Sequence, residues 1–154
     1  MKSILILVFW LITFSCLGNN VEKGEQETQK LLDAVLPLTK KLLVDNQEFF
    51  PFGEIMKSNG EQVNLSASND RERPRSSDLI SILQEHYIES AKSEEIIASA
   101  LVYDVKIKNS DAIAVDLDHT DGYSVTVIVP YELDGNKLVT GEMFTIKGKS
   151  AIFN

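Results

Sequence analysis

The chain has 154 residues, of which 44% are hydrophobic and 25% are charged, a composition typical of an ordinary globular domain. It carries 15 basic and 23 acidic residues, for a net charge of -8, and it lacks a dense basic cluster, so we expect no nucleic-acid partner. Its single cysteine excludes an internal disulfide and a cysteine-based metal site.

The first residues of the chain are typical of an export signal. Lys2 provides a short positive region, and residues 4–12 form an unbroken apolar run. That run is too short to span a bilayer, which needs roughly 18 or more apolar residues. We therefore expect an exported protein, with residues 1–18 as a signal peptide and residues 19–27 as a polar tether to the folded domain.

Two modes of processing are compatible with the position of Cys16. Thr13-Phe14-Ser15-Cys16 resembles the lipobox of bacterial lipoproteins, although threonine stands where that motif usually has leucine. The resemblance implies cleavage after residue 15 and acylation of Cys16, which would anchor the protein to a membrane in the cell envelope. Cleavage after Gly18 would instead discard the cysteine and give a periplasmic or secreted protein. We favour the lipoprotein.

A first helix is predicted from residue 28 onward. Thr28 is a candidate cap, and Pro37 should kink the helix because it lacks a backbone donor. The apolar positions recur at helical spacing, and they are Leu31, Leu32, Val35, Leu36, Leu38, Leu42 and Leu43.

A hairpin and a second helix follow. Asn59-Gly60 is a strong hairpin signal, and a two-residue turn there pairs Met56 with Val63. After a polar loop over residues 66–75, Ser76 or Ser77 should cap the second helix, with Asp78 favourably placed in its first turn. That helix should fray over residues 90–93.

Residues 98–132 predict three consecutive antiparallel strands with alternating apolar side chains. A three-residue loop over 120–122, with Gly122 in the left-handed region, sets Leu117 against Val125. By the same logic a loop over 109–111 sets Ile107 against Ile113 and places all the large side chains on one face.

Short strands at 137–140 and 142–146 complete the predicted elements. Asp134-Gly135 supplies the turn before them. The order helix, hairpin, helix and run of strands predicts one α+β domain over residues 28–154. In it, an antiparallel sheet of the hairpin, the three-stranded meander and the short C-terminal strands carries two helices packed on one face.

Several short motifs resemble a widespread set of small bacterial proteins of uncharacterised function. They are Phe50-Pro51-Phe52-Gly53, Asp111-Ala112-Ile113, His119 with Asp121-Gly122-Tyr123, Pro130-Tyr131 and Ile152-Phe153. The resemblance spans most of the mature chain. It implies a single domain and no particular activity.

Residues 112–120 resemble the nucleophile motif of the haloacid dehalogenase superfamily, in which a strand ends in Asp-x-Asp-x-Thr. The resemblance implies that Asp116 attacks a phosphoryl group, that Asp118 acts as general acid and base, and that Mg²⁺ neutralises the phosphate. That motif belongs near the start of a parallel α/β domain, whereas here Gly122 and a strand follow Thr120. A metal-dependent phosphohydrolase is therefore the alternative function.

The function that we favour is a non-enzymatic, membrane-tethered domain that binds another envelope protein or a small ligand, with no cofactor. No metal site is expected, because His86 and His119 lack partners at metal-ligand spacing. The candidate ligand or partner surface comprises Asp104, His119, Tyr123 and Tyr131. The aromatic cluster Phe49-Phe50-Phe52 is a further candidate, although such side chains are usually buried.

The predicted register also places Asp104 directly across from Asp116. Two facing carboxylates are either screened by water and nearby Lys106 or bridged by a cation. We expect screening, because the next strand places only the hydroxyls of Ser124 and Thr126 opposite Asp118 and Asp116.

If Cys16 is acylated, cells that are fed a labelled fatty-acid analogue should label the wild-type protein and not Cys16→Ser. The variant should also leave the membrane fraction, since the lipid would be its anchor. Equal labelling of the two proteins, or no labelling of either, would contradict the lipoprotein interpretation.

Overall fold

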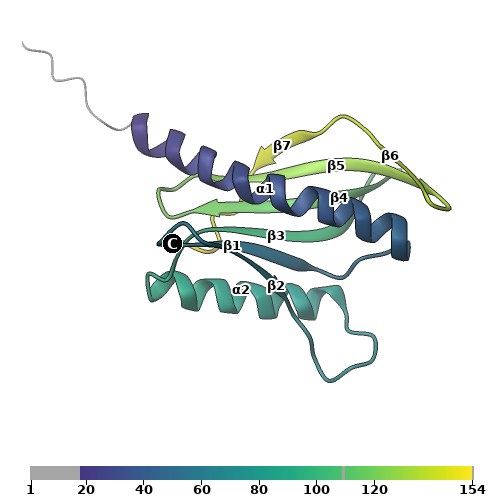
Figure 1. Cartoon of the computed structure of the whole chain (residues 1–154), viewed down its shortest axis with the longest axis horizontal. Coiled ribbons are helices and arrows are strands. Elements are labelled where there is room, and N and C mark those ends of the chain that lie inside the picture. The colour runs from purple at the N-terminus through teal and green to yellow at the C-terminus, as the bar shows by residue number, and fades with distance from the viewer. Residues whose placement is uncertain (1–17, 109, 154) are drawn as a thin grey trace, which may run out of the picture.

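Two helices and a seven-stranded antiparallel sheet make up the computed structural model, which describes residues 18–108 and 110–153. The helices are α1 (Gly18–Asn46) and α2 (Ser76–Lys92). The strands are β1 (Phe52–Lys57), β2 (Gln62–Ser66), β3 (Ile96–Ile107), β4 (Ser110–His119), β5 (Ser124–Asp134), β6 (Lys137–Thr140) and β7 (Phe144–Lys147). The sheet order is β2-β1-β3-β4-β5-β6, and β7 also pairs with β5 (Figure 1). The predicted α+β class is confirmed, whereas the export signal and Cys16 lie outside the described residues.

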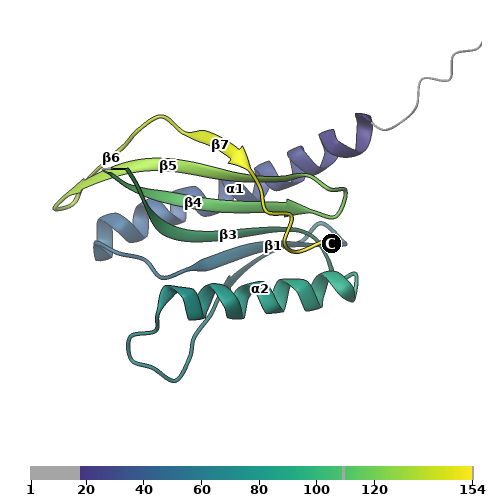
Figure 2. The ribbon, with the colours of Figure 1, turned by 180° about the vertical axis from the view of Figure 1, so that it is seen from behind.

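The two helices cover opposite faces of the sheet. Ala98, Ala100 and Val102 of β3 are fully buried in the core cluster with α1, whereas Leu101 belongs to the cluster with α2. Accordingly, α1 lies in front of the sheet in Figure 1, and α2 lies in front in Figure 2. The prediction of two helices on one face is therefore wrong. The reason is that the first half of β3 is apolar on both faces, with small alanines turned toward α1.

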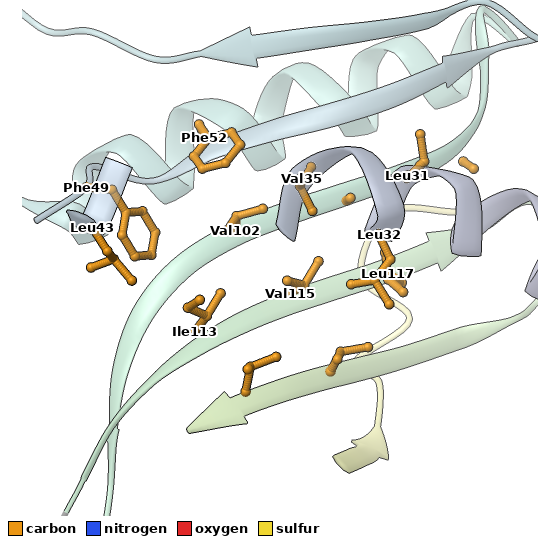
Figure 3. Packing of buried hydrophobic residues seen from close by; sticks show 14 of the residues in the cluster. Leu31, Leu32, Val35, Leu43, Phe49, Phe52, Val102, Ile113, Val115 and Leu117 are labelled. Carbon is orange, nitrogen blue, oxygen red and sulfur yellow. The ribbon is translucent and has the colours of Figure 1, made fainter. Parts of the chain in front are cut away.

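The helix α1 supplies most of the larger core. Leu31, Leu32 and Val35 point from it toward the strands, where Val115 and Leu117 of β4 meet them (Figure 3). It also begins earlier than predicted, because residues 19–27, expected to form a polar tether, are helical. Thr28 is therefore not a cap. Within the described ranges, neither helix is long and apolar enough to cross a membrane.

The predicted pairing of β4 with β5 is confirmed. Leu117 pairs with Val125 and Val115 with Val127. The connecting loop has three residues; the His119 N–H donates a hydrogen bond to the Tyr123 carbonyl, and the Gly122 N–H donates one to the His119 carbonyl. Gly122 has φ of +94°, the left-handed conformation that this loop requires.

Two other predicted registers are wrong. Ile107 pairs with Ser110, so the β3–β4 connection is shorter than the predicted 109–111 loop, and Leu101 rather than Asp104 lies opposite Asp116. In the first hairpin Ile55 pairs with Val63, because the loop includes Ser58 as well as Asn59-Gly60. An odd shift of register turns every side chain to the other face. That is how Leu101 and Tyr103 of β3 come to lie in the cluster with α2.

Docking of α2 depends on one glycine beneath a tyrosine. Tyr87 is fully buried, and its hydroxyl donates a hydrogen bond to the Ala100 carbonyl at 3.1 Å. A Cβ atom on Gly53 of β1 would lie 1.5 Å from that hydroxyl oxygen. The helix therefore approaches the sheet closely only because position 53 has no side chain. Arg75, rather than the predicted Ser76 or Ser77, is the N-cap.

Gly53→Ala should lower the free energy of unfolding by about 1–3 kcal/mol, the usual cost of overpacking a core. Urea unfolding would measure it. In a Tyr87→Phe background, which lacks the obstructing hydroxyl, the same substitution should cost less. Strictly additive effects of the two substitutions would contradict this packing.

Candidate functional site

Asp116 of β4 is held by three side chains. Its carboxylate accepts hydrogen bonds from the Tyr103 hydroxyl at 3.0 Å and the Thr126 hydroxyl at 2.6 Å, and Lys149 Nζ lies 3.6 Å away. As predicted, Asp116 pairs with Thr126 across β4 and β5. Both carboxylate oxygens are thus engaged by side chains of the protein itself.

Asp118 lies on the same face of β4 and is covered by the end of the chain. It is 6% exposed and accepts a hydrogen bond from the Ala151 N–H at 3.3 Å. Burial raises the pKa of this carboxyl. The cavity beside Asp116 and Asp118 has a volume of about 10 Å³, which suits about one water molecule and not a phosphoryl group. This cavity therefore does not fit the substrate that the phosphohydrolase alternative requires.

Asp104 and Tyr131 contact each other on the α1 side of the sheet. The Tyr131 hydroxyl donates a hydrogen bond to Asp104 at 2.9 Å, and Asp104 pairs with Ile113 across β3 and β4. The expectation that Asp104 faces Asp116 is therefore wrong, as the shifted register requires. Among residues 18–108 and 110–153, no group of three or more acidic, histidine or cysteine side chains is placed to hold a metal ion.

His119 forms a clamp between the sheet and α1. Its ring nitrogens lie 2.8 Å from a carboxylate oxygen of Glu27 and 2.8 Å from one of Asp121. The other oxygen of Asp121 accepts a hydrogen bond from the Gly24 N–H at 3.0 Å. Tyr123 is half-buried beside this clamp, and its backbone N–H donates to Asp121. The clamp joins residues far apart in the sequence and holds the N-terminal half of α1 in place.

The aromatic cluster divides between core and surface. Phe49 and Phe52 are buried and pack edge to face with ring centroids 6.3 Å apart, whereas Phe50 is 47% exposed. Phe50 borders a groove of about 580 Å³ between α1 and β2. Leu38 and Leu42 line the groove from the helix side.

A second groove lies on the opposite face of the sheet, between α2 and β2. It also has a volume of about 580 Å³, and Val63 and Leu65 of β2 line it together with Ile55 and Ile96. His86 contributes from α2. Each groove is within the usual size range of ligand sites. The strand β2 therefore lies between two largely apolar concavities.

The outer side of β2 carries unpaired backbone groups. β2 ends the sheet and pairs only with β1 among the described strands. The Lys57 N–H donates to the Glu61 carbonyl at 2.8 Å, so the alternation of an antiparallel ladder directs the backbone groups of Gln62, Asn64 and Ser66 outward. We call this strand edge with its two grooves the β2 edge.

Sequence reasoning did not identify the β2 edge. The only sequence signals for it are the short alternation of polar and apolar residues over 62–66 and the aromatic Phe50. Neither shows that β2 ends the sheet, because the neighbours of a strand are decided by the whole topology.

Asp118→Asn should stabilise the protein increasingly as the pH rises from acidic to neutral. Burial raises the pKa of Asp118 in the folded state, so ionisation favours the unfolded state, and this penalty appears as the pH rises through the folded-state pKa. Urea unfolding at several pH values would measure the difference from wild type. Asp134→Asn, at an exposed position, is the control. A pH-independent difference between Asp118→Asn and wild type would contradict a raised pKa of Asp118 in the folded state.

No protein-family model matches the chain, and no match is found among curated proteins or among solved structures. The arrangement of the chain's own residues is therefore what bears on function. Of the sites described above, the β2 edge is the one that combines free backbone groups with apolar concavities of ligand size.

Proposed function

We propose that the protein is a non-catalytic, exported interaction domain that binds an extended segment of another protein by strand addition at the β2 edge. The observation that carries this proposal is the position of β2 at the end of the sheet, between two grooves of about 580 Å³ each. In strand addition, backbone hydrogen bonds supply affinity and pockets for alternate side chains supply specificity.

The two grooves indicate the chemistry of the partner. Successive side chains of a strand point to opposite faces. A segment that pairs with Asn64 and its outward neighbours would place alternate side chains in the α1 groove, beside Phe50, and in the α2 groove, beside Leu65. The segment that fits best is therefore apolar at consecutive positions.

Charge at one end of the β2 edge favours one orientation of the partner segment along β2. Glu61, Glu94 and Glu95 are exposed near the start of β2, and Lys57, bonded to Glu61 at 3.0 Å, is the one lysine or arginine among the described residues that line the α2 groove. The excess negative charge there favours a basic residue on the partner. For an antiparallel partner strand, that residue follows the apolar run at its C-terminal end.

An anchor on Cys16 would place this edge away from the membrane. Only Leu17 separates Cys16 from the start of α1. Leu38, which lines the α1 groove, lies about 30 Å further along the helix at 1.5 Å per residue. The proposed partner is thus an envelope protein with an exposed extended segment, and the lipid is the contact with the membrane.

Binding of a fluorescent peptide of valine and phenylalanine that ends in lysine would test strand addition. Asn64→Pro removes an outward backbone donor without removing a backbone hydrogen bond to β1, and it should weaken binding at least tenfold, as followed by fluorescence anisotropy. Asn64→Ala loses the same side chain but keeps the donor, so it should bind within about twofold of wild type. Unchanged binding by Asn64→Pro would refute the proposal, and equal losses in both variants would refute the role of the backbone.

A further inference from the structure

The other edge of the sheet also exposes apolar side chains. Val139 on β6, Phe144 and Ile146 on β7, and Met143 just before β7 are each between 44 and 52% exposed. Among the described strands β7 pairs only with β5, so its outer side is unpaired. Natural proteins usually protect such an edge, because it readily pairs with another strand.

The direction of the free backbone groups on β7 follows from one hydrogen bond. The Gly148 N–H donates to the Ser124 carbonyl at 3.2 Å, and Phe144 and Ile146 pair with Ile128 and Thr126. The alternation of the antiparallel ladder then leaves the backbone N–H and C=O groups of Thr145 and Lys147 directed away from β5.

We propose that β7 pairs antiparallel with β7 of a second copy of this chain, with Thr145 opposite Thr145. A two-fold axis perpendicular to the sheet keeps each side chain on the same face in both copies. In this register Phe144 of each copy lies opposite Ile146 of the other, so the exposed apolar side chains cover each other. Thr145, whose backbone groups point outward, forms the central hydrogen-bonded pair.

The neighbouring symmetric registers are less complementary. Centring the pair on Phe144 places Ile146 opposite Glu142, and centring it on Ile146 places Phe144 opposite Gly148. Only the register centred on Thr145 gives both Phe144 and Ile146 an apolar partner. A self-complementary patch of this kind is what an isologous interface requires.

Charge complementarity favours a second copy over an unrelated strand. The edge segment begins with exposed Glu142 and ends with exposed Lys147, and Lys149, which also contacts Asp116 of its own chain, follows it. Antiparallel pairing brings the acidic start of one copy beside the basic end of the other, at both ends of the interface. Lys147 also lies opposite Met143 of the second copy, where its methylene chain covers the exposed thioether.

This dimer leaves the β2 edge free, because β2 and β7 lie at opposite edges of the sheet (Figure 1). Each dimer would thus present two β2 edges. The inference does not depend on strand addition at β2.

Disulfide trapping of the full-length protein in its membranes tests the pairing. Thr145→Cys places two thiols on residues whose Cα atoms lie about 5.5 Å apart in a hydrogen-bonded antiparallel pair. That separation suits a disulfide. Mild oxidation should give a dimer on a non-reducing gel, and the parent chain controls for any bond through Cys16. Val139→Cys, which is also exposed but lies far from the two-fold axis, should stay monomeric.

A monomeric Thr145→Cys, equal cross-linking of Val139→Cys, or an adduct with a different protein would each overturn the proposal. Sedimentation of the purified full chain gives a second measurement. Thr145→Pro removes the central outward donor and should shift wild-type dimer to monomer, while Thr145→Ser should remain dimeric. A monomeric wild type would also refute the dimer.

Discussion

The burial of β3 on both faces is the constraint on which the rest of the structure depends. Ala98, Ala100 and Val102 pack under α1, while Leu101 packs under α2 on the other side. A strand with apolar residues on both faces must be covered twice, because any exposed apolar face costs free energy in water. The small alanines let α1 approach closely. Gly53 allows the same close approach of Tyr87 and α2 on the other face.

The polar side chains that the sequence indicated as candidate site residues make contacts within this packed structure. Asp116 is bonded to Tyr103 and Thr126, Asp118 accepts the backbone N–H of Ala151, and His119 links Glu27 to Asp121. A buried polar group without a partner would cost about 1–3 kcal/mol, so each such bond favours the folded chain. The Asp-x-Asp spacing thus reflects a strand whose polar face is covered by the C-terminal segment.

With both faces of the central strands covered, the edges of the sheet remain open to other strands. They differ in character. The β2 edge is set between two grooves lined from α1 and α2, so it suits an extended segment with apolar side chains on both faces. β7 carries exposed apolar residues, Phe144 and Ile146, on one face, and these suit a strand of the same kind, such as its own copy. Unpaired backbone at a strand edge is therefore the basis of both proposed kinds of partner.

The sequence by itself determined the α+β class, the two helices and the β4–β5 register, because side-chain periodicity and the positive φ of Gly122 are local properties. Tertiary structure decided which face each helix covers, where α1 begins and how β3 meets β4. These depend on contacts between residues far apart in the chain, such as Gly24 with Asp121. The β2 edge belongs to the second group, because a strand becomes an edge only when all the others have been placed.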